Sequence, residues 1–222
     1  MSDDQIPHAV ETTEVSKRYG YVTALRSVSL AIDPGEVVAF FGHNGAGKTT
    51  LLRCIATHVR PSSGTVRVFG EEISEHGARA RRRIGLLTHE SYLYPELSVR
   101  ENLRFYARLF SADEAGYQSL VDSFGLRRWY SARVGTLSYG LRKRAEIVRA
   151  LLHDPDLLLF DEPFAGLDTG TCGLLVDLIT AQREPGRTVV VSSHSREWLD
   201  GCCDREIVFE RGEVVRDAPY GR

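Results

Sequence analysis

The stretch that most constrains this chain is a glycine-rich segment, Gly42 to Thr50, which reads Gly-His-Asn-Gly-Ala-Gly-Lys-Thr-Thr. It follows the apolar run Val37 to Phe41 and precedes a helix-like run, Leu51 to Val59. The spacing of its outer glycines and of the lysine and threonine after them fits the pattern G-x-x-x-x-G-K-[ST]. A strand, a glycine-rich turn and a helix in this order predict a loop that binds phosphate groups.

Each residue type in this loop has a chemical reason. Glycines let the backbone curl so that several N–H groups point at phosphate oxygens, and the following helix adds its positive N-terminal end. The Lys48 ammonium can reach the β and γ phosphates, and the Thr49 hydroxyl can ligate Mg²⁺. The residues expected to contact the nucleotide are Gly42, His43, Asn44, Gly45, Ala46, Gly47, Lys48, Thr49 and Thr50.

The overall composition excludes few classes but argues against some partners. The 222 residues suffice for a full hydrophobic core, and a net charge of -2 gives no electrostatic case for nucleic acid. No apolar run approaches the roughly 20 residues that span a bilayer, and the first ten residues are acidic and polar, so we expect a cytosolic chain. Spacing predicts neither zinc binding nor a disulfide scaffold for the four cysteines, which are Cys54, Cys172, Cys202 and Cys203.

Hydrophobic patterning predicts an α/β fold. Residues 9–32 form short β-like segments, and strand signals then alternate with helical ones, which indicates a mixed, mainly parallel sheet with an N-terminal antiparallel β region. Ile207 to Phe209 and Val214 to Val215 are predicted to close the sheet as a hairpin. The expected later strands are Val66 to Phe69, Ile84 to Leu87, Leu157 to Phe160 and Thr188 to Ser192.

The middle of the chain has a different period. Apolar residues recur at i, i+3, i+4 and i+7 from Leu103 and again from Tyr117, with no strand between them. We therefore expect residues 91–150 to form a helical subdomain inserted in a single domain that spans residues 1–222.

Two carboxylates at the end of a strand are candidates for metal binding and for catalysis. The run Leu157 to Phe160 is followed by Asp161 and Glu162, which should therefore lie at the carboxyl edge of the sheet. There Asp161 can hold the Mg²⁺ carried by Thr49, and Glu162 can act as general base toward the water that attacks the γ-phosphate.

These motifs, with others in the same order, make the chain resemble the nucleotide-binding subunits of ATP-binding cassette (ABC) transporters, which are P-loop NTPases. Tyr19 matches the aromatic residue that stacks on adenine. The stretch Leu137-Ser138-Tyr139-Gly140 resembles the family signature, of which Ser138 and Gly140 are expected to bind nucleotide. Ala165 to Asp168 matches a loop at the subunit interface, and His194 matches the histidine that contacts the γ-phosphate.

The resemblance implies an ATP hydrolase that works as a head-to-tail dimer. Each ATP, with Mg²⁺, would lie between the phosphate loop of one subunit and the signature of the other, and hydrolysis would drive a membrane permease. The chain would then lie in the cytoplasm, peripherally attached to the membrane through that permease. Its catalytic residues would be Glu162, His194 and Lys48.

The sequence departs from the family pattern in two places. The family places a glutamine after the strand that corresponds to Ile84 to Leu87, whereas this chain has His89, with Glu90 as an alternative. Either residue is a candidate to orient water, and His89 is a candidate Mg²⁺ contact. In the signature, Tyr139 replaces a glycine and Leu141 replaces a glutamine, and Leu141 removes a polar group from the expected interface.

Alternative functions remain open at this stage. A soluble ABC protein that acts on the ribosome or DNA is one, and a small-molecule kinase, which would explain the phosphate loop alone, is another. Among transporters, residues 89–110 are typical of exporters. The histidine followed by glutamate is similar to haem-export ATPases of cytochrome c maturation, with drug or antibiotic export as the rival.

Overall fold

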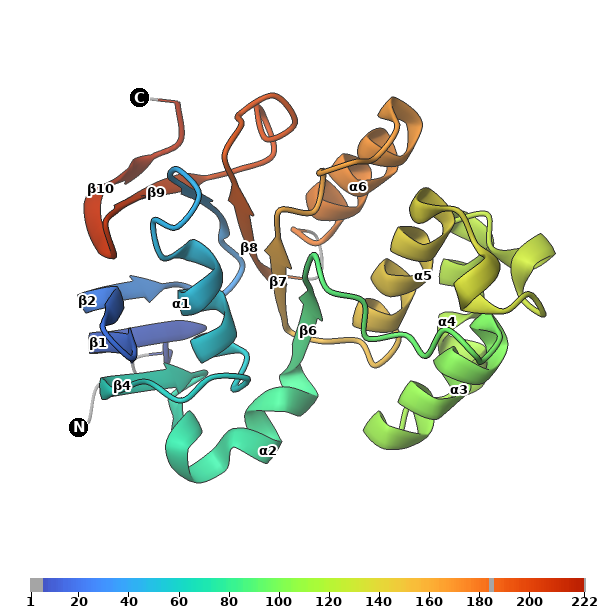
Figure 1. Cartoon of the computed structure of the whole chain (residues 1–222), viewed down its shortest axis with the longest axis horizontal. Helices are drawn as coiled ribbons and strands as arrows, with labels where there is room; N and C mark the ends of the chain where they lie inside the picture. Colours follow the sequence, from blue (N-terminus) through green and yellow to red (C-terminus); the bar gives the residue numbers. More distant parts are fainter. Residues whose placement is uncertain (1–5, 184–185, 222) are drawn as a thin grey trace.

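The structure, a computed structural model, describes residues 6–183 and 186–221, which form two β-sheets and a helical part (Figure 1). The larger sheet has the order β10-β9-β3-β8-β7-β6. Its strands are β3 (Val37–Phe41), β6 (Ile84–Leu87), β7 (Leu157–Asp161), β8 (Thr188–Ser193), β9 (Arg205–Glu210) and β10 (Glu213–Pro219). All neighbours pair in parallel except the closing hairpin of β9 and β10. The mixed, mainly parallel sheet is thus confirmed.

The smaller sheet is antiparallel and is built mainly from the N-terminal region, as predicted. Its order is β2-β1-β4-β5, and β1 pairs with both β2 and β4. The strands are β1 (Val10–Tyr19), β2 (Val22–Ile32), β4 (Ser63–Val68) and β5 (Glu71–Glu72). In β2, Val28, Leu30 and Ile32 are buried while the residues between them are more exposed, so one face of the strand packs on the core.

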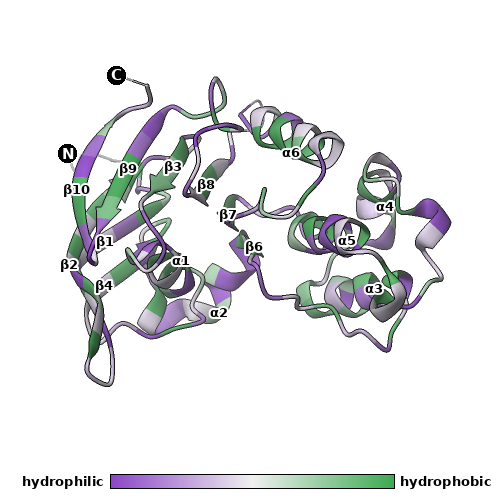
Figure 2. Cartoon of the chain, turned by 45° about the horizontal axis from the view of Figure 1, so that its top comes forward, coloured by the Kyte–Doolittle hydropathy of each residue, from purple (hydrophilic) through white to green (hydrophobic). Residues whose placement is uncertain are grey.

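Strand β3 divides the core into two layers. Its residues are all buried, but Val38 and Phe40 pack on the side of α1 and the antiparallel sheet, whereas Val37, Ala39 and Phe41 pack on the other side. Figure 2 shows the corresponding concentration of hydrophobic residues on the central strands β3 and β8. Burial on both faces explains why this strand reads as a continuous apolar run.

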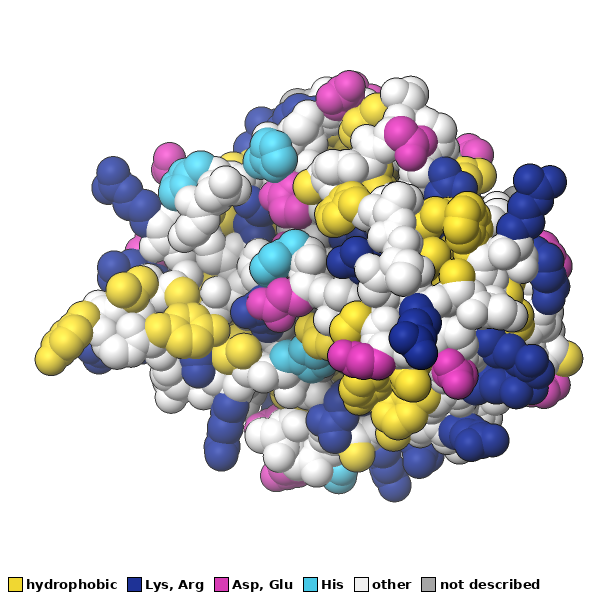
Figure 3. All heavy atoms as spheres, turned by 45° about the vertical axis from the view of Figure 1, so that its right-hand side comes forward, with side chains coloured by type: hydrophobic (Ala, Val, Ile, Leu, Met, Phe, Trp, Pro, Cys, Tyr) yellow, Lys and Arg dark blue, Asp and Glu magenta, His cyan; other side chains and the backbone are white. Residues whose placement is uncertain are grey.

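Six helices surround the strands in the described residues. They are α1 (Lys48–Ile55), α2 (Ile73–Arg83), α3 (Val99–Phe110), α4 (Glu114–Ser123), α5 (Tyr139–Leu151) and α6 (Thr169–Ala181). Helices α3, α4 and α5 lie together beyond β6, away from α1 and the antiparallel sheet, in both ribbon views. A capping box begins α3, since Ser98 accepts from the Glu101 amide and Glu101 accepts from the Ser98 amide. Figure 3 shows Lys and Arg side chains gathered over this helical part.

The helix after the phosphate loop is shorter than the sequence predicts. The pattern predicts a helix to Val59, but α1 ends at Ile55. Thr57 adopts a left-handed conformation with φ of 63°, and its amide donates to the carbonyl of Cys54 at 3.0 Å. A left-handed residue ends the α-helical hydrogen-bond ladder, and Pro61 follows a few residues later.

No helix among residues 6–183 and 186–221 is long and apolar enough to cross a membrane. All four cysteines are free, and Cys54, Cys172 and Cys202 are buried. The three buried cysteines pack as small hydrophobic residues.

The close contact between β6 and the end of α5 gives a test of the packing. A Cβ on Gly85 would lie 2.4 Å from the carbonyl oxygen of Ala150 and 2.7 Å from Cδ2 of Leu158. We expect Gly85→Ala to lower the free energy of unfolding by about 3 kcal/mol, because an overpacked site must move backbone atoms. Gly116→Ala is the control, since nothing lies within 4 Å of that position in α4. A urea titration showing equal midpoints for the two variants would contradict this packing.

Candidate nucleotide site

The phosphate loop connects β3 to α1, and its glycines have structural reasons. Gly42 has φ of 146°, and a Cβ there would lie 2.4 Å from the carbonyl oxygen of Phe209. Gly47 has φ of 114°, and a Cβ there would lie 2.8 Å from the carbonyl oxygen of Ala24. Both conformations and both approaches require glycine. Helix α1 then begins at Lys48, so its positive N-terminal end faces the loop.

The Lys48 side chain folds back over this loop. Its ammonium donates to the carbonyl oxygens of Gly42 at 2.6 Å and of His43 at 3.3 Å. It is also 3.6 Å from Oε1 of Glu162, and the lysine is only 5% exposed. The ammonium is therefore held between the loop and a carboxylate, where it can meet phosphate oxygens that enter the loop.

Thr49 and Asp161 meet as the sequence predicts. The Thr49 hydroxyl donates to Oδ1 of Asp161 at 2.9 Å, and the Ser192 hydroxyl donates to the same oxygen at 2.6 Å. The three residues lie on α1, β7 and β8, and Asp161 and Ser192 are both buried. The parallel pairing of β7 with β8 sets Asp161 directly beside Ser192 at the carboxyl edge of the sheet.

This hydroxyl and carboxylate pair suits Mg²⁺. Hard oxygen donors are the ligands that Mg²⁺ prefers, and the ion normally completes its octahedron with phosphate oxygens and water. Within the described residues no group of three or more His, Cys, Asp or Glu side chains is placed to hold a metal ion. A hydroxyl and a carboxylate would leave the remaining positions on the ion to phosphate oxygens and water, so these donors fit an ion that arrives with a nucleotide.

Glu162 has an unusual backbone and a free acceptor. Its φ of 47° is left-handed, and its amide donates to the carbonyl oxygen of Ser192 at 3.2 Å and to the Ser192 hydroxyl at 3.0 Å. Its Oε2 accepts from Nδ1 of His194 at 2.9 Å. Its Oε1 is buried and has no hydrogen-bond partner in the structure. The Lys48 ammonium, at 3.6 Å, is an ion-pair partner beyond hydrogen-bond distance, so this oxygen can still accept a hydrogen bond from a bound water.

The loop after β6 places His89 closer to this centre than Glu90. His89 Nδ1 is 4.0 Å from Oδ2 of Asp161, which is too long for a direct hydrogen bond, and its side chain is 62% exposed. Glu90 instead accepts from Arg53 of α1 at 2.8 Å. The role of His89 as a metal contact stays a prediction.

The signature segment lies apart from the phosphate loop of the same chain. Ser138 is exposed and caps α5, accepting from the Leu141 amide at 3.4 Å. Helices α1 and α5 lie on opposite sides of β6 and β7 in both ribbon views. The strands of the larger sheet therefore separate α5, which begins with the signature, from the phosphate loop before α1.

The two departures in the signature have structural explanations. The Tyr139 hydroxyl donates to the carbonyl oxygen of Ala165 at 3.2 Å, and a Cβ on Gly166 would lie 3.1 Å from the Tyr139 ring. Tyr139 thus packs on the loop that ends at Asp168. Leu141 is partly buried against the larger core cluster, where a leucine contributes packing.

The loop that ends at Asp168 continues into α6. Asp168 caps this helix, and its carboxylate accepts from the backbone amide of Thr171 at 2.9 Å and from the Thr171 hydroxyl at 3.0 Å. The amide first, and then the hydroxyl, holds the pKa of Asp168 below its ordinary value. Asp168 is therefore favoured in its ionised form, in which it caps α6.

Tyr19 ends β1 and is 47% exposed, with Lys17 Nζ 5.0 Å from the ring centroid. An exposed ring is available to stack on a base. The contact between Tyr19 and adenine stays a prediction. Tyr21, two residues later, is fully exposed and is a second aromatic group at the same strand end.

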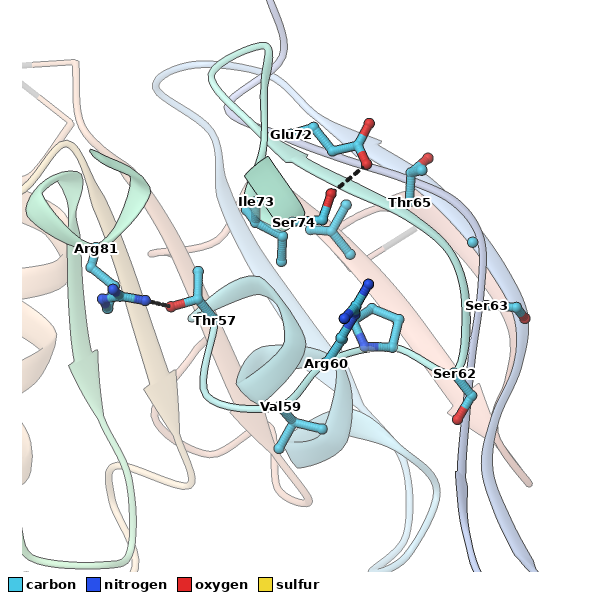
Figure 4. A pocket seen from close by; sticks show the side chains of 13 residues that line it. Thr57, Val59, Arg60, Ser62, Ser63, Thr65, Glu72, Ile73, Ser74 and Arg81 are labelled. Atoms are coloured by element: carbon cyan, nitrogen blue, oxygen red, sulfur yellow. Dashed lines mark hydrogen bonds between the residues drawn. The ribbon is translucent and has the colours of Figure 1, made fainter. Parts of the chain in front are cut away.

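A separate pocket of about 440 Å³ lies elsewhere in the fold, between the residues after α1, strand β4 and the start of α2 (Figure 4). Its polar groups partner one another, since Ser74 donates to Glu72 at 2.6 Å and Arg81 donates to Thr57 at 2.9 Å. It contains none of the residues that surround Asp161. It therefore adds nothing to the nucleotide site.

Sequence reasoning missed one central residue. Ser192 contacts both Asp161 and the Glu162 amide, and it is fully buried. A polar residue at the end of the apolar run from Thr188 could have indicated it, because the ends of parallel strands meet at one edge.

Comparison with known proteins agrees with this geometry. The family model described as ABC transporter matches residues 25–165. The ABC transporter ATP-binding protein NatA of Bacillus subtilis (strain 168) is 39% identical over 215 residues, covering 93% of this chain and 87% of that protein. A Nod factor export ATP-binding protein I of Rhizobium etli is 35% identical over 213 residues, covering 94% of this chain and 67% of that protein.

A solved structure shows the same fold. It is the dimeric post-hydrolysis state of the ATP-binding cassette MJ0796 bound to ADP and Pi, with a TM-score of 0.85 and 28% identity. The match covers 95% of this chain and 98% of that one. Family model, relatives and fold agree, and the chain therefore belongs to the ABC transporter family as an ATP-binding subunit that hydrolyses ATP.

Proposed function

We propose that two copies of this chain bind two molecules of ATP with Mg²⁺ head to tail. Each nucleotide lies between the phosphate loop, Gly42 to Thr50, of one copy and the signature, Ser138 to Gly140, of the other. The observation that carries the proposal is the position of Ser138, which is exposed at the N-terminus of α5, a helix that the strands of the larger sheet separate from α1 and its phosphate loop. Anions bind well at such a terminus, so a second molecule can present its γ-phosphate there.

Hydrolysis follows from the geometry around Glu162. The buried Oε1 accepts a proton from water, and the hydrogen bond from His194 holds the carboxylate in place. Lys48 contributes positive charge as the bond between the β and γ phosphates breaks, and a Mg²⁺ ion would add positive charge there when bound. Thr49 and Asp161 are the residues that would hold the ion. The products are ADP and phosphate, and the shared site is then free to open.

In this proposal a membrane permease uses the free energy of ATP hydrolysis. The permease is best identified as the protein that binds this chain. The direction of transport proposed is export. It is supported by residues 89–110 and by the similarity to Nod factor export ATP-binding proteins. Haem export for cytochrome c biogenesis stays a prediction, as does a peripheral position on the inner face of the membrane. Residues 91–150 are proposed as the helical subdomain that contacts the permease. The second candidate, a soluble protein acting on ribosomes or DNA, differs in its partner.

One experiment separates these candidates. The tagged chain is purified from detergent-solubilised cells of its source, and the bound proteins are identified by mass spectrometry. We expect one integral membrane protein in roughly equal amount, because paired ATPase and permease subunits form symmetric assemblies. The transport claim is contradicted if ribosomal proteins or DNA copurify in salt-resistant amounts and no membrane protein does.

A further inference from the structure

Helix α5 carries three charged side chains that are buried. Lys143, Glu146 and Arg149 are 5%, 3% and 7% exposed. Burial lowers the pKa of Lys143, and the charges of Glu146 and Asp161 oppose that shift. Buried charges persist only where they are paired and hydrogen-bonded, so each of these side chains needs specific partners.

The partners of Lys143 and Arg149 lie on β6, on the segment that follows it and on α5 itself. Lys143 Nζ donates to the carbonyl oxygen of Thr88 at 2.9 Å, and Arg149 donates to that of Leu86. Arg149 also donates to Oε2 of Glu146 at 2.9 Å. The signature helix is therefore bonded directly to the end of β6 and to the start of the next loop.

Glu146 holds the far end of the same loop. Its Oε1 accepts from the Ser91 hydroxyl at 2.5 Å and from the backbone amides of Tyr92 at 2.7 Å and Leu93 at 3.1 Å. Four donors converge on this carboxylate, counting Arg149, and charge-assisted hydrogen bonds of this kind are the strong ones. Residues 88–93 are thus fixed to α5 at both ends.

The tip of this loop reaches the nucleotide site. His89 lies 4.0 Å from Asp161, and Glu90 is paired with Arg53 of α1. Ser138 caps the N-terminal end of α5. It precedes Glu146 by eight residues, which corresponds to about 12 Å along a rigid helix. Helix α5 therefore connects residues 88–93, beside the nucleotide of their own chain, to the signature, which is expected to contact the nucleotide of the other copy.

We propose that Glu146 is a positioning residue that makes residues 88–93 and the signature helix move as one body, and so couples the two ATP sites of the dimer. The inference rests on the proposed head-to-tail dimer. When a nucleotide moves the loop, Ser138 moves with it, because the three bonds to Oε1 leave the loop no separate motion. Reciprocal coupling between the sites then follows from linkage.

The test is Glu146→Ala in the full chain. Turnover is measured against ATP concentration, and ATP binding to the monomer is measured by fluorescence titration with a nucleotide analogue. We expect binding within about two-fold of wild type, turnover lower by about ten-fold, and a Hill coefficient that falls from about 2 to about 1. Glu114→Ala is the matched control, because Glu114 is a carboxylate paired with Arg104 on the neighbouring helix, away from this loop.

Two further variants separate positioning from stability. Glu146→Gln keeps an oxygen acceptor for the loop, and we expect turnover within about three-fold of wild type with cooperativity retained. The double variant Glu146→Leu, Arg149→Leu removes both members of the buried pair, so neither charge is left unpaired. It also leaves the Ser91 hydroxyl and the Tyr92 and Leu93 amides without their acceptor, so we expect a lower unfolding temperature, a chain still folded at the assay temperature, and no cooperativity.

The outcomes divide cleanly. The proposal is overturned if Glu146→Ala, or the folded double variant, retains turnover and cooperativity, or if the wild-type Hill coefficient is itself about 1. It is also overturned if Glu146→Gln loses as much as Glu146→Ala. Failure of the head-to-tail dimer would appear separately, as a wild-type chain whose Glu162→Gln variant forms no dimer with ATP.

Discussion

Glu162→Gln is expected to reduce ATP turnover by about 10²- to 10⁴-fold and to accumulate an ATP-bound dimer. The glutamine keeps the size of the side chain but cannot accept the proton from water. Phosphate release measures the turnover, and gel filtration with and without ATP measures the dimer. Binding should survive, because the phosphate loop and Lys48 are unchanged.

The matched control is Glu197→Gln, three residues after His194, where the side chain is exposed. It should turn over ATP at the wild-type rate and remain free of the trapped dimer. Near-normal turnover in Glu162→Gln would refute the role of Glu162 as base, whatever its effect on association.

Ser138→Arg is the second prediction with a large effect. The arginine would stand at the exposed N-terminus of α5, where the proposed dimer brings the γ-phosphate of the other copy. We expect turnover to fall by at least about 10²-fold, because removing a group that positions or stabilises transferring charge has effects of this size. ATP binding by the isolated monomer should be nearly unchanged, since Ser138 caps α5 and lies apart from the phosphate loop before α1 of its own chain.

Ser123→Arg is the control for this variant, because Ser123 is an exposed serine in the last turn of α4. It should hydrolyse ATP normally. Loss of monomer binding in Ser138→Arg would place the signature in the site of its own chain, against the shared-site proposal.

Much of this site could be predicted because its parts are contiguous in sequence. The phosphate loop needs its glycines, lysine and threonine at fixed spacing, and Asp161 and Glu162 end an apolar strand. Both patterns record local constraints, so the meeting of Thr49 with Asp161 followed from the parallel sheet alone. The prediction that the helix after the phosphate loop continues to Val59 was wrong. The apolar pattern continues to Val59, but the backbone turns at Thr57.

The remaining features depend on contacts between distant segments. Ser192 lies 31 residues from Asp161, and Glu146 lies 55 residues from Ser91. The spacing of residues within a short segment does not predict such contacts. A glutamate within an amphipathic helix is ordinarily expected to be exposed. Tyr139 is similar, since its packing on Gly166 becomes apparent only when the two loops are adjacent in space.

The most direct test of the shared site mixes the two inactive variants. In a mixed dimer, the phosphate loop and Glu162 of the Ser138→Arg chain face the intact signature of the Glu162→Gln chain, so one complete site re-forms. Random pairing makes half of the dimers mixed, and each mixed dimer has one of two sites complete, so equal amounts combined before ATP is added should recover up to about a quarter of wild-type turnover. If the mixture is as inactive as either variant alone, each nucleotide site does not draw on two chains and the account is contradicted.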